Sequence, residues 1–190
     1  MNALDLLLNR SSQPRLQAPA PEGEVLENIM QSALRAPDHR CLTPWRFVVC
    51  TGKGLNRLGD IFQQAAILAD ADEAVVTRAA QLPLRAPMVV VAIADYKEDE
   101  KVPRVEQIAS TACAVNAMQM AAVAQGFQGV WRTGSYATDE NVKRLLIVNP
   151  RTRFWVFYIW ALLQLSHCRN PLECHSSFSH FGNNKILTNK

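Results

Sequence analysis

Two short polar stretches near the start of the chain carry residue types that could form a functional site. The first places a guanidinium beside two hydroxyls, at Arg10, Ser11 and Ser12, and such groups hold a phosphate or a polyol through charge-assisted hydrogen bonds. The second places Arg35 and His39 in a polar loop ahead of a strand, which is a common location for functional residues. From the residues alone, a helix end that favours a cation explains the first stretch, and a turn with solvated charges remains open for the second.

A long apolar stretch lies later in the chain, at residues 110–126. It is apolar on nearly every face, and a helix of this kind belongs in the middle of a protein core. The hydroxyls of Ser110 and Thr111 are predicted to cap its first turn, because a hydroxyl accepts from a free N–H there. Gly126, which adopts positive φ without penalty, is predicted to follow its last turn.

The segment after this helix, at residues 129–133, is predicted to be a short strand. It carries an indole and a guanidinium, at Trp131 and Arg132, to the mouth of a sheet. A core helix and strand without any chemistry remain an open alternative, because apolar helices usually belong to the core.

The composition indicates one domain of ordinary size. A chain of 190 residues buries a sizeable core, and its net charge of +3 forms no basic stripe for nucleic acid. Five cysteines without a C-x-x-C pair argue against a disulfide framework. The first residues lack the features of a signal peptide, and no apolar run reaches membrane length. We therefore expect a cytoplasmic protein that binds neither nucleic acid nor membrane.

Hydrophobic periodicity predicts the elements that position these residues. Leu4, Leu7 and Leu8 make one apolar face of a helix over 1–9. The continuous Val, Ile and Ala run at 88–94 is typical of a strand covered on both faces. Three further helices are predicted, over 24–34, over 55–80 with a break near 70–72, and over 141–146 with Thr138 as the N-cap. A strand is predicted over 45–51 and an exposed loop over 95–104. Helices and strands that alternate in this way indicate an α+β or three-layer α/β protein.

Six motifs follow one another along residues 1–149. They are Asn9-Arg10-Ser11-Ser12, Arg35-Ala-Pro-Asp-His39, Pro44-Trp45, Arg85-Ala-Pro87, Lys101-Val-Pro-Arg104, and the run from Ala117 through Gly126 to Trp131-Arg132. Together they resemble the FMN-dependent nitroreductase family, in its minimal single-domain NAD(P)H nitroreductase branch. The resemblance implies an α+β, three-layer α/β/α fold whose central, mainly antiparallel sheet is flanked by helices.

The resemblance also implies where the cofactors bind. The implied FMN contacts are Arg10, Ser11, Ser12, Arg35, His39, Trp131, Arg132 and Thr133, several of them reaching across an obligate homodimer with two FMN sites at its interface. The implied nicotinamide nucleotide segment is Ala121, Ala122, Val123, Ala124, Gln125 and Gly126. The chain departs from the family pattern at Ser11, where members commonly carry a second arginine, so one charge is missing from the phosphate site.

The chemistry that the resemblance implies is hydride transfer from NAD(P)H through FMN to a nitro compound or a quinone-like acceptor, without a metal. The flavin supplies this chemistry while the protein supplies binding and electrostatics, so no catalytic acid, base or nucleophile is expected. Arg35 and Arg132 are the candidates for stabilising the phosphate or the reduced, anionic flavin. The alternative is a flavin-binding or inactive relative, left without turnover by its altered carboxyl-terminal part and by Ser11.

The resemblance ends near Arg151, where family members place a strand ending in Gly-Phe-Leu-Tyr-Leu-Gly-Thr-Pro. Residues 154–163 can be translated back into codons whose third bases are free to vary. When these codons are read in the frame that starts one base earlier, they yield Leu-Gly-Phe-Leu-Tyr-Leu-Gly-Thr-Pro. Tryptophan has a single codon, and each of the two tryptophan codons in this stretch gives Leu-Gly in the shifted frame. We therefore expect a nitroreductase-like FMN-binding domain over 1–150 and a divergent, frame-shifted, partly disordered tail over 151–190. The cysteines and histidines of this tail lack the spacing of a zinc site; they are His167, Cys168, Cys174, His175 and His180.

Overall fold

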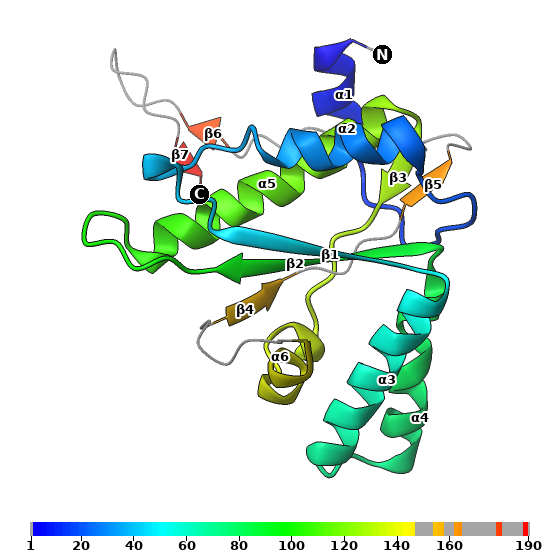
Figure 1. The fold of residues 1–190 in the computed structure, drawn as a ribbon. Helices are drawn as coiled ribbons and strands as arrows, with labels where there is room; N and C mark the ends of the chain where they lie inside the picture. The colour runs from blue at the N-terminus through cyan, green and yellow to red at the C-terminus, as the bar shows by residue number, and fades with distance from the viewer. Residues whose placement is uncertain (1, 147–153, 158–161, 165–177, 180–187, 190) are drawn as a thin grey trace.

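Antiparallel strands form the centre of the fold. β1 (Trp45–Thr51) pairs with β2 (Met88–Asp95) along its whole length, and β4 (Phe154–Phe157) pairs with the other edge of β2, which gives the order β1-β2-β4. The computed structural model describes residues 2–146, 154–157, 162–164, 178–179 and 188–189. Figure 1 shows how the rest of the chain is arranged around these strands.

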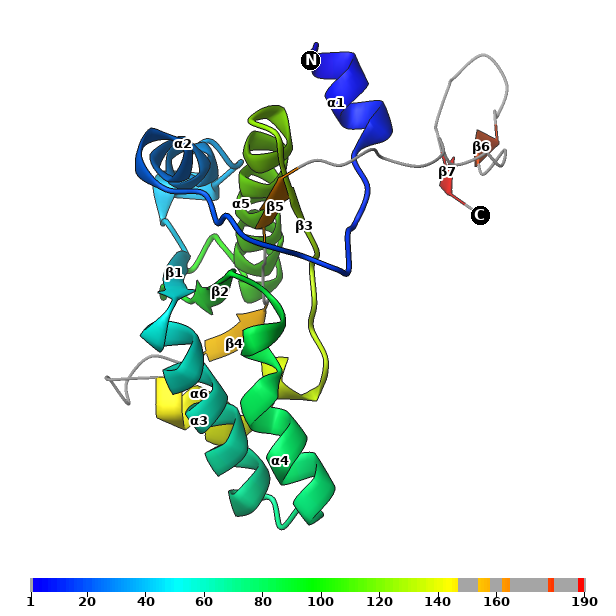
Figure 2. The same ribbon diagram turned by 90° about the vertical axis from the view of Figure 1, so that its right-hand side faces the viewer.

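Helices cover both faces of this sheet, as Figures 1 and 2 show. On one face lie α2 (Gly23–Ala33) and α5 (Arg104–Ala124), and on the other lie α3 (Lys53–Leu68), α4 (Glu73–Gln81) and α6 (Glu140–Leu146). The predicted α+β fold, with three layers and an antiparallel sheet at its centre, is therefore confirmed. The other described elements are α1 (Ala3–Asn9), β3 (Phe127–Gly129), β5 (Leu162–Gln164), β6 (Phe178–Ser179), β7 (Thr188–Asn189) and the short 3-10 helices η1 (His39–Cys41), η2 (Pro83–Arg85) and η3 (Ser135–Ala137).

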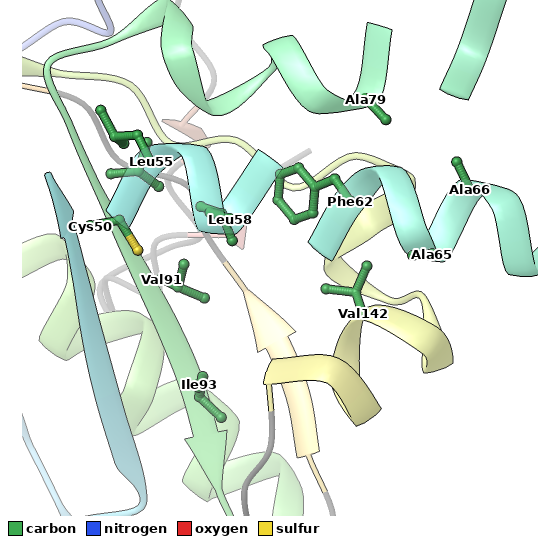
Figure 3. Packing of buried hydrophobic residues seen from close by; sticks show 11 residues of the cluster. Cys50, Leu55, Leu58, Phe62, Ala65, Ala66, Ala79, Val91, Ile93 and Val142 are labelled. Carbon is green, nitrogen blue, oxygen red and sulfur yellow. The ribbon is translucent and has the colours of Figure 1, made fainter. Parts of the chain in front are cut away.

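β2 supplies side chains to two separate hydrophobic cores, because successive side chains of a strand point to opposite faces. The two sets alternate along the strand, with Met88, Val90 and Ala92 on the side of α2 and α5, and Val89, Val91 and Ile93 on the side of α3, α4 and α6. Figure 3 shows the second of these cores. Every residue of β2 is buried, so the prediction of a strand covered on both faces is confirmed.

Most predicted elements of the first hundred residues are confirmed. β1 has the predicted bounds, and the helical stretch that follows is broken as predicted, with Asp70 at φ +52° between α3 and α4. The exposed loop predicted over 95–104 is wrong at two positions. Asp95 is the buried last residue of β2, and Val102 is buried as well, so this loop is tied to the core at both places.

The first turn of α5 lies earlier than predicted. The helix begins at Arg104, directly after Pro103, so the predicted capping by Ser110 and Thr111 is wrong. A proline suits the start of a helix because its missing N–H has no partner there in any case. Ser110 and Thr111 are buried inside the helix, and the Thr111 hydroxyl lies 3.0 Å from the carbonyl oxygen of Pro44. This hydroxyl therefore ties α5 to the chain that enters β1.

The chain after α5 becomes extended sooner than predicted. Gly126 follows the helix with φ +89°, as predicted, and its N–H donates to the Val123 carbonyl. β3 therefore spans Phe127–Gly129, and the strand predicted over 129–133 is wrong beyond its first residue, since Arg132 forms only an isolated bridge. The reason is that the Gly129 carbonyl accepts the backbone N–H of Gln13, after which the chain runs along a different segment.

The start of α6 is capped by a carboxylate and not by the predicted hydroxyl. Asp139 Oδ1 accepts the backbone N–H groups of Asn141 at 2.7 Å and Val142 at 3.0 Å. A negative charge is favoured at a helix N-terminus, where the free N–H groups carry partial positive charge. The prediction that Thr138 caps this helix is therefore wrong.

The tail predicted over 151–190 lies mostly outside the described residues, apart from its short strands. Its proposed frame shift, its partial disorder and its five cysteines and histidines thus stay predictions. The helices that the structure describes are each too short or too polar to cross a membrane.

Gly59 packs α3 directly against α4, and this contact gives a prediction for stability. A Cβ placed on Gly59 would overlap the carbonyl oxygen of Ala80, which is backbone and cannot turn away. We expect Gly59→Ala to lower the free energy of unfolding by about 1–3 kcal/mol through overpacking. Gly54→Ala is the matched control in the same helix, because its nearest neighbour, the Cβ of Cys50, would lie 3.8 Å away.

Urea denaturation of both variants checks this prediction. Gly54→Ala is expected to stabilise the protein by about 0.4–1 kcal/mol, since alanine reduces the entropy of the unfolded chain. A Gly59→Ala protein with an unchanged denaturation midpoint would contradict the prediction, because it would show that α3 and α4 can move apart without lowering the free energy of unfolding.

Candidate functional site

A cavity of about 570 Å³ opens beside the start of β2. One wall is formed by α4, η2 and the first residues of β2, and the opposite wall by residues 130 and 132–136. Pro14 and Leu16 complete the lining, although they come from the other end of the chain. The cavity therefore joins three segments that are far apart in the sequence.

The stretch Arg10-Ser11-Ser12 comes shortly before Pro14 and Leu16, which line the cavity, but is not itself part of the lining. The backbone N–H of Gln13 donates to the Gly129 carbonyl at 3.1 Å, so the segment after Arg10 is bonded to the end of β3, two residues before Trp131. Arg10 Nη1 reaches the Ser12 hydroxyl at 3.5 Å, and the Gln13 side chain donates to the Ser11 hydroxyl at 3.1 Å. The structure thus brings together two of the three groups of predicted FMN contacts.

The lining of the cavity combines apolar side chains with positively charged ones. Three arginines are among its lining residues, Arg78 of α4, Arg85 of η2 and Arg132. Aliphatic side chains fill much of the remaining wall; they include Leu16, Val75, Leu82, Val89 and Val130. No aspartate or glutamate is among the described residues that line it. Such a lining suits a flat, apolar molecule that carries negative charge.

Arg35 and His39 lie at the other end of the sheet. They precede β1, whose first residue Trp45 pairs with Ala94, whereas the cavity adjoins the opposite end of β2, near Val89. The length of β1 separates the two ends, roughly 20 Å at about 3.3 Å per residue. A single protomer therefore does not place Arg35 and His39 at the cavity.

His39 sits in an ionic surface at that end. Its Nδ1 lies 2.9 Å from Glu106 Oε2 in the first turn of α5, and about half of each side chain is exposed. The neighbouring Arg40 pairs with Asp99 at 3.0 Å. These contacts hold the loop between α2 and β1 against the first turn of α5 and the loop that precedes it.

The predicted nicotinamide segment, residues 121–126, is mainly structural in one protomer. Ala122 and Val123 are buried in or against the core. The Gln125 amide donates to the Val25 carbonyl at 3.3 Å and accepts from Asn28 at 3.0 Å, so it fastens α5 to α2. The prediction that this segment contacts a nucleotide stays a prediction.

Tyr136 is a cavity residue that the sequence reasoning missed. Its ring stacks on Phe62 of α3, with ring centroids 4.7 Å apart. Burial and the charge of Asp139 raise the pKa of the Tyr136 phenol, although the Arg78 charge acts in the opposite direction. The phenol therefore remains a hydrogen-bond donor at neutral pH. Its position two residues after Gly134 and four after Arg132 was the signal in the sequence.

Two of the arginines were also missed as site residues. Arg85 belongs to one of the six sequence motifs but had no assigned role, and its place just before a buried strand could have located it. Arg78 shares one helical face with Val75 and Leu82, which lie three residues before it and four after it, but this pattern alone does not reveal a cavity.

Comparison with known proteins gives consistent matches. Residues 7–159 match the model of the family described as "Nitroreductase family". The chain is 50% identical over 143 residues to "Putative NAD(P)H nitroreductase YdjA" of Escherichia coli (strain K12), a match that covers 75% of this chain and 78% of the relative.

The fold is shared with solved structures at low sequence identity. The "Nitroreductase-like Family Protein from Bacillus cereus" superposes with a TM-score of 0.74 at 18% identity, covering 90% of this chain and 89% of that chain. A Desulfovibrio desulfuricans structure, described as a "putative nitroreductase in complex with fmn", superposes with a TM-score of 0.65 at 22% identity, covering 90% and 94%.

Proposed function

Since the chain belongs to the nitroreductase family, a family of oxidoreductases, we propose that it is an FMN-dependent enzyme that uses NAD(P)H to reduce nitro compounds or quinone-like acceptors. The name of the Escherichia coli relative supports NAD(P)H as co-substrate, and the FMN complex of the Desulfovibrio desulfuricans protein supports FMN as cofactor. When bound, the flavin supplies the hydride and electron transfer chemistry.

The observation that carries this proposal is the cavity between η2 and residues 130–136. Its aliphatic walls fit a flat isoalloxazine ring, and Arg132 supplies positive charge where a reduced flavin or its phosphate is negative. Arg10 and Ser12 lie on the segment bonded to Gly129 and would hold the phosphate. The residues present therefore fit FMN, with the protein binding and orienting the cofactor and the aliphatic walls excluding water from it.

We further propose that two copies of the chain complete the site. Arg35 and His39 cannot reach the cavity of their own protomer, because β1 and β2 hold them at the opposite end of the sheet. A second protomer would bring its own Arg35 and His39 to this cavity. The exposed leucine face of α1, adjoining Arg10, is an apolar surface that such a dimer would bury.

The first test is the colour of the purified protein. We expect an absorbance band of oxidised flavin, bleached under anaerobic conditions by NADH or NADPH and restored by a nitroaromatic compound. Bound flavin that neither nucleotide reduces would instead support the alternative of a flavin-binding, inactive relative. Protein that stays colourless after incubation with excess FMN would rule out both.

Arg10→Ala tests the phosphate contact. Removal of one charge-assisted bond, about 1.5–3 kcal/mol, is expected to weaken FMN binding by about 10- to 150-fold. Titration of the flavin-stripped protein with FMN, followed by quenching of flavin fluorescence, measures the dissociation constant. Arg15→Ala is the matched control, because Arg15 is exposed and absent from the cavity lining.

Ser11→Arg is the complementary change at the position where the chain departs from the family pattern. It adds a charge beside Arg10 and is expected to tighten FMN binding. Equal dissociation constants for Arg10→Ala and Arg15→Ala would remove the phosphate role from this segment.

A further inference from the structure

The face of α4 that borders the cavity combines apolar side chains with one guanidinium. Val75, Arg78, Ala79 and Leu82 all line the cavity and follow the spacing of a single helical stripe. A stripe of this kind normally contacts the protein core, yet Val75 is 46% exposed here and Arg78 is exposed as well. The part of this face at Val75 and Arg78 is therefore available to a ligand, whereas Ala79 is buried in the core.

Arg78 has no acidic partner in the described part of the chain. Its guanidinium takes part in none of the ion pairs described there, and the described lining of the cavity contains no carboxylate. Its place in the last turn of α4 accounts for a cation near a helix C-terminus but not for its position at a cavity. Its positive charge is thus free to act on a ligand.

Tyr136 lines the same cavity as Arg78. The two are close enough for the Arg78 charge to act on the pKa of the phenol, and Tyr136 is held in place by its stack on Phe62. A guanidinium and a phenolic O–H are both hydrogen-bond donors, and together they match the two oxygens of a carboxylate. Val75 and Leu82 supply apolar surface beside them for an aromatic ring.

We propose that Arg78 and Tyr136 form an anion subsite for the electron acceptor, so that the enzyme prefers aromatic acceptors that carry a carboxylate. This inference rests on the proposed function, since it concerns the acceptor that shares the cavity. Arg132 and Arg10 belong to segments assigned to the flavin phosphate, whereas Arg78 and Arg85 have no flavin assignment, and of these two only Arg78 stands on the apolar stripe of α4. The subsite fixes the acceptor by its charge, and the aliphatic stripe of α4 holds its ring.

The test compares two nitroaromatic probes that differ in charge, 4-nitrobenzoate and 4-nitrobenzamide. Isothermal titration calorimetry of the flavin-loaded protein measures the dissociation constant of each probe without turnover. Wild-type protein is expected to bind the benzoate more tightly, and Arg78→Met is expected to lower this preference by about five- to tenfold, as loss of one charge-assisted bond at a partly exposed site does. Tyr136→Phe, which keeps the ring stack, is expected to lower it less.

Arg57→Met is the matched control, because Arg57 is exposed on α3 and absent from the cavity lining. It is expected to keep the wild-type preference, and all variants are expected to keep the wild-type flavin content. Equal binding of the two probes by wild-type protein, or a preference that survives in Arg78→Met, would overturn the subsite. Failure of the protein to bind flavin would instead overturn the proposed function, and the same titrations on the flavin-free protein would still decide whether Arg78 selects the benzoate.

Discussion

Expression of the gene with its reading frame shifted from about Phe154 is expected to raise soluble yield and flavin content together. In the present frame, β4 and the chain after it carry Trp155, Phe157 and Trp160 where the shifted frame has Gly, Leu and Gly. β4 pairs with β2 there, with Trp155 opposite Ala94 and Phe157 opposite Ala92. This is the edge of a strand that is buried along its whole length.

The size of the effect follows from packing. Overpacking a well-filled sheet costs about 1–3 kcal/mol for each large ring. Two or three such changes are a large share of the roughly 5–15 kcal/mol by which a domain is stable. We therefore expect the chain in its present frame to be prone to aggregation and only partly loaded with flavin.

Both frames are expressed side by side, and soluble yield and flavin per protomer are measured. A synonymous recoding of residues 154–163 in the present frame serves as the control, since it changes the codons and leaves the protein unaltered. Equal yield and equal flavin content in the two frames would show that the tail is a genuine, tolerated sequence.

Replacement of the leucine face of α1 is expected to produce a monomer that does not retain FMN. Leu4, Leu7 and Leu8 are 68%, 62% and 77% exposed in the protomer, although a helix stripe of this kind normally faces a core. Burial of each leucine in a dimer would contribute about 1.5–3 kcal/mol. A two-fold symmetric interface uses each position twice, so a double substitution removes four leucines.

The Leu4→Gln, Leu8→Gln double variant tests this expectation, because glutamine is a good helix former and leaves α1 intact. Sedimentation velocity gives the oligomeric state, and flavin absorbance per protomer gives the occupancy. The matched control is the Ile67→Gln, Leu68→Gln variant, which changes two residues that are 52% and 55% exposed at the end of α3. A folded monomer saturated with FMN would contradict the proposal of a shared site.

Local sequence patterns determined most of the secondary structure. β1 and the break between α3 and α4 follow from side-chain periodicity and from residues that disfavour helix, and these act over a few positions. The same locality explains the errors at Ser110 and Thr138. Each of these hydroxyls suits a helix cap, but Pro103 lets α5 start earlier and Asp139 caps α6 in place of its neighbour. When two residues a few positions apart could both cap a helix, the packing of the folded chain decides which of them does so.

The sequence by itself identified two polar segments as candidates, one at Arg10-Ser11-Ser12 whose guanidinium and hydroxyl groups can hold a phosphate, and one at Arg35 and His39 in a loop ahead of a strand. The tertiary structure alone decided which of them meet. The bond from Gln13 to Gly129 joins the segment that follows Arg10 to the strand that precedes Arg132, whereas the antiparallel register of β1 and β2 holds His39 at the far end of the sheet. It also decided that Arg78 faces a cavity, because that depends on how α4 packs beside residues 130–136, and no spacing along one helix encodes the position of another segment.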